Sequence, residues 1–322
     1  MSGLVGLIAN PAAGRDIRRL AAHASVVPNH EKAAIVRRLL RGLAGAGVKR
    51  VAYLPDLAGI VATAAQGLDE VIISPLPMRP HGTAEDSAEA ARLLAAAGAD
   101  VIVTLGGDGT NRAVAAGCGD VPLVAVSTGT NNVFPAMLEG TVAGLAAGYV
   151  ALRHPDADTV APRTKRVVVH GAGVDDFALV DAASCRERFV GSRAIWEPGQ
   201  VHRLVLTRGD PSSVGLSAIA GALCPVEPTE PSGLLVELGD GPAVTIPLAP
   251  GLVVPVQVAG WRRLAVGENV PLTRGEGTIA LDGERSLTPS GPVTATVTRE
   301  GPRLVDVRAA LRSGPGKGCC HD

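Results

Sequence analysis

Residues 101–111 read VIVTLGGDGTN, an apolar run followed by a loop of small and polar residues. Residues 121–132, VPLVAVSTGTNN, repeat this order a short distance later. Apolar runs rich in Val and Ile are typical of parallel strands that are buried on both faces. In an open α/β sheet, ligands bind beyond the carboxyl ends of the strands. The two loops therefore predict a ligand site at one edge of a parallel sheet.

The first loop has the features of a phosphate site that also holds one carboxylate. Gly106, Gly107 and Gly109 predict a turn with positive φ and a backbone open to phosphate oxygens. We expect the next helix to begin near Asn111 and to direct its positive dipole end toward the loop. Asp108 is suited to orienting a nucleophile or to reaching a metal through water. A tight turn in which Asp108 caps the helix explains the same residues, so this loop alone does not decide the function.

The second loop supplies donors and acceptors suited to ribose hydroxyls or an adenine edge. The side chains concerned are Thr128, Thr130, Asn131 and Asn132. A strand-to-helix turn with an Asn cap is the alternative explanation. A third polar loop follows the first strand, at Asn10, Pro11 and Gly14. The arginines after it, Arg15, Arg18 and Arg19, fit either a phosphate or a solvated helix face. The chain contains no GxxxxGK[ST] pattern and no dinucleotide-binding GxGxxG pattern.

The chain divides into an alternating half and a β-type half. In the alternating half, strands are expected at 4–8, 50–54, 70–74, 101–105 and 121–126. One helix is expected at 31–46, with Asn29 as its N-cap, and another at 83–97, with a capping box from Thr83 to Asp86. After about Arg153, short β-type segments follow at 166–170, 177–183, 203–207, 234–238, 244–248, 253–258, 278–281, 293–298 and 304–307, with one helix at 213–223. The pattern predicts an α/β nucleotide-binding domain with a parallel sheet (1–153), a mostly antiparallel β-rich domain (154–312) and a flexible tail (313–322).

Composition excludes several classes of partner. The 322 residues carry a formal net charge of −1, so neither a nucleic-acid surface nor an anionic-membrane surface is expected. Aromatic residues make up 2%, which argues against a stacking platform. The 5 cysteines are scattered without a CxxC pair and no signal-peptide pattern opens the sequence, so a reduced, cytoplasmic protein is expected. Cys319, Cys320 and His321 lie in the tail, where disorder is a simpler explanation than a metal site.

On these residues, the chain resembles the NAD kinase and diacylglycerol kinase-like superfamily, and most closely its ATP-NAD kinase branch of acetoin-catabolism type. The resemblance covers most of the chain. It is carried by residues 8–11 with Gly14, by 106–110 and by 128–135, and in the second half by 189–194, 214–221 and 281–284. It implies an NAD kinase-like fold: an α/β domain, a β-rich domain and a nucleotide cleft between them.

The resemblance also implies an activity. Members transfer a phosphoryl group from ATP to the adenosine 2′-hydroxyl of NAD, making NADP. By analogy, Asp108 would be the catalytic residue, accepting or orienting the hydroxyl proton, with ATP and Mg²⁺ as cofactors. The glycines and Thr110 would hold phosphates, Asn131 and Asn132 would bind the acceptor nucleotide, and Ser217 would line the acceptor side. The full set of expected binding residues is Asn10, Gly106, Gly107, Gly109, Thr110, Asn111, Thr128, Gly129, Thr130, Asn131, Asn132 and Ser217, with no direct protein ligand to a metal. A homo-oligomer is expected on the same grounds.

Departures from the pattern leave other functions open. The second Asn-Glu or Asn-Asp pair of common bacterial NAD kinases is not found; Asp181 either replaces it or is a buried strand residue. Residues 213–221 contain no Tyr for adenine recognition. Asp282-Gly283 is a strong hairpin signal, which we interpret as structural. The alternatives are a lipid or other small-molecule kinase of the same superfamily, and an accessory protein that binds nucleotide without turnover.

Overall fold

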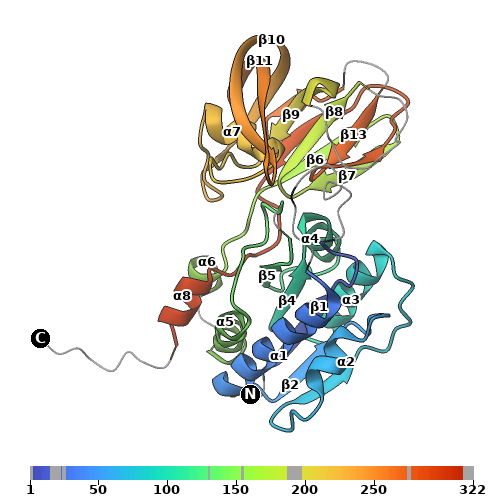
Figure 1. Cartoon of the computed structure of the whole chain (residues 1–322), viewed down its shortest axis with the longest axis vertical. Helices are drawn as coiled ribbons and strands as arrows, with labels where there is room; N and C mark the ends of the chain where they lie inside the picture. Colours follow the sequence, from blue (N-terminus) through green and yellow to red (C-terminus); the bar gives the residue numbers. More distant parts are fainter. Residues whose placement is uncertain are drawn as a thin grey trace, which may run out of the picture.

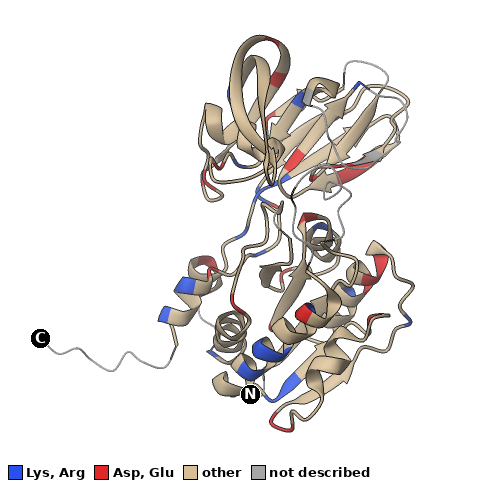
Figure 2. Ribbon diagram, viewed as in Figure 1, with Lys and Arg blue, Asp and Glu red and all other residues tan. Residues whose placement is uncertain are grey.

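The computed structural model describes residues 3–14, 23, 27–129, 131–153, 156–186, 198–273 and 277–314. It has the two parts that the sequence predicts, an N-terminal α/β domain and a C-terminal β-rich domain, joined through a narrow middle region (Figure 1). Charged residues of both signs are distributed over both domains in this view, and several lie where the domains meet (Figure 2). Thr130, Arg15, Arg18, Arg19, the 189–194 motif, Cys319, Cys320 and His321 lie outside the described residues.

A five-stranded parallel sheet forms the centre of the N-terminal domain. Its strands are β1 (Leu4–Ala9), β2 (Arg50–Tyr53), β3 (Ile72–Pro75), β4 (Val101–Gly106) and β5 (Leu123–Ser127). The strand order is β3-β2-β1-β4-β5 and every pairing is parallel. The order reverses direction between β1 and β4. A reversal of this kind opens a crevice at the carboxyl ends of the two strands, where α/β proteins bind ligands.

Helices cover both faces of this sheet. They are α1 (Asn29–Ala46), α2 (Ile60–Ala65), α3 (Ala84–Ala96), α4 (Asp108–Ala115) and α5 (Gly140–Arg153), followed by the short α6 (Ala157–Val160). Side chains of α1, α2 and α5 share one apolar cluster with alternate residues of β1 and β4, whereas α3 and α4 pack in a second cluster with the other residues of those strands. The predicted capping box of Thr83 and Asp86 is confirmed. The predicted N-cap is wrong by one position, because Pro28 is the N-cap of α1 and Asn29 is its first residue.

The C-terminal domain consists of two antiparallel sheets. Its strands are β6 (Arg166–Gly171), β7 (Val174–Ala178), β8 (Asp181–Cys185), β9 (Val201–Leu206), β10 (Ser232–Ala249), β11 (Leu252–Ala265), β12 (Asn269–Pro271), β13 (Thr278–Leu281), β14 (Glu284–Leu287) and β15 (Thr294–Thr298); α7 (Leu216–Leu223) and the 3₁₀ turn η2 (Pro198–Gln200) complete it. The sheet orders are β11-β10-β9-β8-β13-β14 and β12-β15-β6-β7. The strands predicted at 234–238 and 244–248 are one bulged strand, β10.

Two differences from the sequence prediction have clear physical causes. The single strand predicted at 177–183 is broken between β7 and β8, because the N–H groups of Leu179 and Val180 bind the carboxylate of Asp282 instead of a neighbouring strand. The strand predicted at 304–307 is wrong. Leu304 makes a single bridge to Leu123, and the chain then forms α8 (Val307–Arg312), capped by Asp306. Val305 and Ala310 join the N-terminal core. The last described segment, which we assigned to the β-rich domain, therefore packs on the first domain.

Candidate active site

A pocket of about 390 Å³ lies between the two domains, at the carboxyl end of β4. Its described lining comes from α4, the loop after β5, the start of β8, the N-terminal end of α7 and the turn between β13 and β14. The lining residues are Asp108, Asn131, Val133, Asp181, Val214, Gly215, Leu216, Ser217, Leu248, Asp282 and Gly283. The pocket thus brings together Asp108, Asn131 and Ser217, three of the residues that the sequence singled out.

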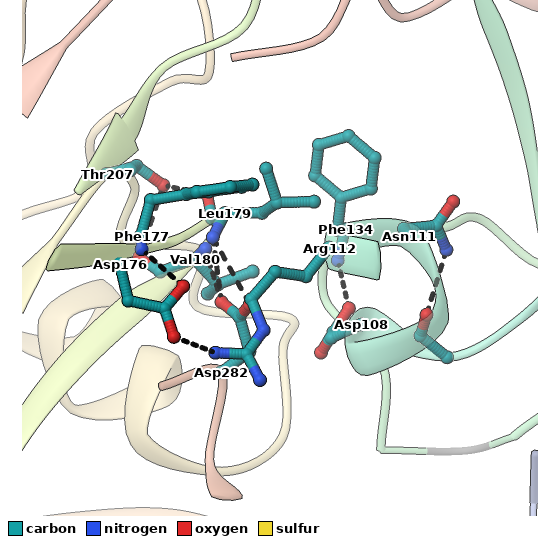
Figure 3. A network of polar contacts seen from close by, with 11 residues as sticks. Asp108, Asn111, Arg112, Phe134, Asp176, Phe177, Leu179, Val180, Thr207 and Asp282 are labelled. Carbon is teal, nitrogen blue, oxygen red and sulfur yellow. Dashed lines mark hydrogen bonds and ion pairs between the residues drawn. The ribbon is translucent and has the colours of Figure 1, made fainter. Parts of the chain in front are cut away.

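Asp108 is the first residue of α4, with Gly107 as the N-cap. The helix starts three residues earlier than predicted, so the carboxylate sits at the positive end of the helix dipole. Its Oδ1 accepts the N–H group of Phe134 at 2.8 Å (Figure 3). Oδ1 also accepts the N–H group of Val133 at 3.1 Å, and Oδ2 lies 3.1 Å from the same nitrogen. These donors fix the orientation of a carboxylate that borders the pocket, which is the geometry required of a group that orients a hydroxyl.

The glycines of the first loop serve a different purpose from the one predicted. Gly106, Gly107 and Gly109 are not among the positive-φ glycines, so the predicted positive-φ turn is wrong. Space is the reason for two of them: a Cβ at Gly106 would lie 2.5 Å from the Thr110 side chain, and one at Gly107 would lie 2.7 Å from Asn132 Oδ1. A Cβ at Gly109 would meet no heavy atom within 4 Å. The loop is therefore closely packed against its neighbours at Gly106 and Gly107, and has open space beside Gly109.

The loop after β1 is tied directly to the glycine-rich loop. Asn10 Nδ2 donates to Thr110 Oγ1 at 2.8 Å, and Asn10 Oδ1 accepts the N–H of Ala12 at 2.8 Å. Beneath this loop, the fully buried Lys32 of α1 donates from Nζ to the carbonyl oxygens of Asn10, Pro11 and Ala13 at 2.8–3.0 Å. The three carbonyls converge on one ammonium group, so the backbone of this loop is held in a single arrangement. The sequence analysis did not single out Lys32.

Within the second loop, some predicted ligands face the pocket and others bond inward. Asn131 lines the pocket, and its buried Oδ1 accepts no hydrogen bond from the described residues. The hydroxyl of Thr128, which is 1% exposed, also lacks a hydrogen-bond partner there. Asn132 instead donates to Ser127 Oγ at 2.8 Å and to the carbonyl of Gly129 at 3.3 Å. Asn132 and Gly129 thus shape the loop, whereas Asn131 lines the pocket with its amide oxygen unsatisfied by the described residues.

Asn111 supports the first loop from inside the protein. It is fully buried; its Oδ1 accepts the hydroxyl of Thr104 at 2.7 Å, and its Nδ2 donates to the carbonyl of Gly107 at 2.9 Å. Both ends of the amide are therefore occupied. In this arrangement Asn111 fixes the backbone of Gly107 and presents neither end of its amide to a nucleotide.

The β-rich domain contributes two further carboxylates to the pocket, those of Asp181 and Asp282. The Asp282-Gly283 turn has φ values of 52° and 76°, so the predicted hairpin is confirmed. The turn also borders the pocket, because Asp282 and Gly283 are among its lining residues. The Asp282 carboxylate accepts the N–H groups of Leu179 at 3.0 Å and Val180 at 2.8 Å. Burial, together with the charges of Asp108 and Asp181, raises the pKa of Asp282 to about 8, and Arg112 opposes this shift.

Ser217 lies in the first turn of α7, with its hydroxyl buried against the pocket and without a hydrogen-bond partner among the described residues. Gly215, at φ 95°, is the N-cap of α7 and borders the same pocket. Ser217 and Asn131 thus offer a hydroxyl and an amide oxygen from opposite domains. Such unpartnered buried groups are what a polar ligand satisfies on binding.

A second pocket, of about 320 Å³, lies beside the first at the carboxyl ends of β1, β2 and β3. It is lined by Asn10, Pro11, Leu54, Asp56, Leu57, Pro80, Gly82, Thr83, Asp86 and Ser87. Its two carboxylates are occupied as caps: Asp56 accepts N–H groups at the start of α2, and Asp86 accepts those of residues 81–83. The remaining lining is largely apolar with two hydroxyls. Asn10 borders this pocket and also donates to Thr110 of the glycine-rich loop, whose Asp108 borders the first pocket, so one hydrogen bond connects the walls of the two pockets.

The described residues contain no group of three His, Cys, Asp or Glu side chains that could hold a metal ion. Mg²⁺ in phosphotransferases is usually held by one or two carboxylates and by substrate phosphates. Asp108, Asp181 and Asp282, the carboxylate residues at the first pocket, are of the type that fits that role. Within the described part of the chain, no helix is long and apolar enough to cross a membrane.

Comparison with known proteins assigns relatives to both halves. Residues 5–153 match the ATP-NAD kinase N-terminal domain, and residues 165–300 match the acetoin catabolism protein X C-terminal domain. Acetoin catabolism protein X of Cupriavidus necator is 41% identical over 328 aligned positions, which cover 96% of this chain and 91% of that protein. A solved structure described as "A putative diacylglycerol kinase from Bacillus anthracis str. Sterne" has a TM-score of 0.49 and 13% identity, covering 94% of this chain and 98% of its own.

Proposed function

Given that the chain belongs to the acetoin catabolism protein X family, we propose that it is an ATP-dependent kinase that phosphorylates the adenosine 2′-hydroxyl of NAD. The match of the first half to an ATP-NAD kinase domain supports a kinase-like function. One observation carries the proposal furthest. The Asp108 carboxylate is held by two backbone N–H groups at the start of a helix and borders a pocket between the domains.

The arrangement of the two pockets supports separate donor and acceptor sites. A base in the 320 Å³ pocket would be followed by phosphates across Asn10, Thr110 and the start of α4. The N–H groups and dipole of that helix favour negative charge. The terminal phosphate would then point toward the 390 Å³ pocket, where the acceptor hydroxyl would lie beside Asp108.

Within this arrangement, each residue has a defined task. Asp108 accepts the hydrogen bond of the acceptor hydroxyl and takes its proton as the oxygen bonds to the terminal phosphorus of ATP, whose bond to the bridging oxygen breaks to release ADP. Asn131 and Ser217 bind the acceptor from the two domains, and Asn10 and Thr110 fix the loop against the donor phosphates. Mg²⁺, if held by the phosphates and the carboxylates of the pocket, would neutralise charge on the transferred group.

The test is NADP formation from NAD, ATP and Mg²⁺ by the unmodified protein and by Asp108→Asn. Removing a general base typically costs 10²- to 10⁴-fold in rate, so we expect kcat to fall by at least about 100-fold in the variant. ATP binding measured by calorimetry should change little, because Asp108 is assigned to the acceptor. Absence of NADP with the unmodified protein, at enzyme concentrations that detect one turnover per hour, would reject NAD as the acceptor.

A second acceptor class is favoured by one observation. The described lining of the 390 Å³ pocket contains no aromatic side chain on which a purine could stack, and residues 213–221 contain no Tyr. Phosphorylation of another small hydroxyl compound therefore remains the alternative within the kinase-like assignment. ADP release in the presence of a panel of nucleosides, sugars, polyols and a short-chain diacylglycerol separates the two, because only the true acceptor raises it above the level without acceptor.

We further propose that the protein acts in the cytoplasm as a homo-oligomer, at least a dimer. The scattered cysteines support a reducing compartment, and the family resemblance supports the oligomer. Light scattering coupled to size-exclusion chromatography measures the mass directly, and a monomer mass near 32.6 kDa would reject the oligomer.

A further inference from the structure

Two arginines, one from each domain, contact residues of the other domain close to Asp108. Arg112 belongs to α4 of the N-terminal domain, one helical turn after Asp108. Its Nε lies 3.8 Å from Asp282 Oδ2, and its Nη1 lies 3.9 Å from Asp176 Oδ2, both in the β-rich domain (Figure 3). Because residues four apart share one face of a helix, Asp108 and Arg112 both face the second domain.

Asp282 is a firm anchor for this arginine. Its side chain is 1% exposed, and its carboxylate is held by the N–H groups of Leu179 and Val180. The Arg112 side chain is itself 20% exposed. Because the pKa of Asp282 is raised to about 8, the Arg112–Asp282 contact is a full ion pair only above that pH, whereas the Asp176 carboxylate lies 3.9 Å from the same guanidinium. Arg112 therefore ties the helix that begins with Asp108 to a rigid part of the β-rich domain.

Arg208 makes the corresponding contact from the β-rich domain to the N-terminal domain. It follows β9 of the β-rich domain and is 7% exposed. Its guanidinium carbon lies 5.5 Å from the centroid of the Phe134 ring, and its Nη1 lies 3.5 Å from the carbonyl oxygen of Val133. Val133 and Phe134 are the two residues whose N–H groups hold the Asp108 carboxylate. Burial lowers the pKa of Arg208, and the charges of Asp108, Asp282 and Asp210 oppose that shift.

We infer that Arg112 and Arg208 are positioning residues that hold the Asp108 carboxylate in place from both sides of the domain boundary. Arg112 fixes the helix that carries Asp108, and Arg208 fixes the loop that supplies its N–H donors. Neither arginine lines the pocket. The catalytic consequence rests on the proposed kinase function; the structural coupling does not.

The variants are Arg112→Met and Arg208→Met, with the Lys variants of both in case a Met variant does not fold. Arg163→Met is the matched control. Arg163 is also at the domain junction, where it forms an ion pair with Asp120 and donates to the carbonyl of Gly301 at 3.2 Å, but it contacts neither α4 nor the loop at 133–134.

The first measurement is hydrogen–deuterium exchange of the peptide that contains Val133 and Phe134, in the full-length protein without added ligand. We expect roughly 10-fold faster exchange of its slow amides in either arginine variant and no change in Arg163→Met. The second is steady-state kinetics with NAD, the proposed acceptor, or with the acceptor that the ADP-release panel identifies. A displacement of about 1 Å can cost 10²-fold in rate, so kcat should fall roughly 10- to 100-fold while the KM for ATP changes less than about twofold.

Unchanged exchange at residues 133–134 in both arginine variants overturns the inference, whatever the activity. Faster exchange together with a higher KM for ATP and an unchanged kcat also overturns the inference, because the arginines would then act on donor binding. If the unmodified protein phosphorylates no acceptor, the proposed function fails while the exchange result still decides whether the two arginines hold the donors of Asp108.

Discussion

Replacement of Lys32 by Met tests whether one buried ammonium group organises the proposed donor site. The two side chains have similar length, so the change removes the charge and the donors with little change in volume. In the unmodified protein, Lys32 Nζ donates to the carbonyls of Asn10 at 3.0 Å, Pro11 at 3.0 Å and Ala13 at 2.8 Å, and lies 3.3 Å from Asn29 Oδ1. The substitution leaves three carbonyl groups without this partner.

The magnitude follows from those three carbonyls. A buried acceptor left unsatisfied costs about 1–3 kcal/mol, which gives about 3–9 kcal/mol for three. The loop is half-buried, so water reaches part of it and the low end, about 3 kcal/mol, is the expected loss. At roughly 2–4 °C per kcal/mol for a domain of this size, Tm should fall by about 6–12 °C.

The functional effect should be specific to the donor. Relaxation of the loop displaces Asn10, whose amide holds Thr110 of the glycine-rich loop. A loss of about 1–2 kcal/mol in ATP binding corresponds to about a 5- to 30-fold rise in Kd, measured by calorimetry so that no acceptor is needed. Lys165→Met is the control: this second buried lysine donates to the carbonyls of Glu227 and Ser232, away from both pockets. It should lower Tm without changing the Kd for ATP. Equal ATP affinities in Lys32→Met and the unmodified protein would refute the reasoning.

Three other outcomes follow from single contacts. Gly106→Ala places a Cβ 2.5 Å from the Thr110 side chain, so we expect a loss of about 1–3 kcal/mol in unfolding free energy and weaker ATP binding; unaltered affinity would show that the loop adapts. Gly144→Ala should destabilise, since its Cβ would lie 2.1 Å from the Leu39 carbonyl across the α1–α5 contact, whereas Gly45→Ala, with 3.9 Å to its nearest neighbour, should stabilise by up to about 1 kcal/mol; urea denaturation giving the same sign for both would contradict this. Asp282 binds its proton up to about pH 8 in the folded state but only up to about pH 4 when unfolded, so its contribution to stability falls as pH rises between these values. The stability of Asp282→Asn relative to the unmodified protein should therefore increase from pH 5 to pH 8, and a constant difference in Tm would exclude the shift.

The sequence predicted the elements that local pattern determines. Apolar runs that alternate with helical segments located all five strands of the parallel sheet to within a few residues. The Asp282-Gly283 pair identified its hairpin. The two loops at the strand ends were identified because parallel strands end at the same sheet edge. Asp108, Asn131 and Ser217 accordingly meet in one pocket.

Sequence patterns did not predict which polar side chains form hydrogen bonds within the protein and which remain available to a ligand. Asn111 and Asn132 are polar loop residues like Asn131, yet the amide of Asn111 bonds to Thr104 and that of Asn132 bonds to Ser127. That choice depends on neighbours from other strands, which spacing along one segment does not reveal. Lys32 is a different case, since a signal was present: it lies four residues before Val36, on the buried face of α1. A charged residue on an apolar helix face needs a partner, and here the partners are backbone carbonyls.

The position of Asp108 depends on segments far apart in the chain. Its helix follows β4, its N–H donors follow β5, and the anchor of Arg112 is the turn at Asp282. The chain also crosses between the domains twice, once before β6 and again before α8. Val305, which precedes α8, and Ala310, which lies in it, are buried in the N-terminal core. Two covalent crossings permit fewer relative rotations than a single hinge would. Phosphoryl transfer depends on alignment of donor, acceptor and base, so a boundary fixed by two crossings and two arginines suits a site whose walls come from both domains.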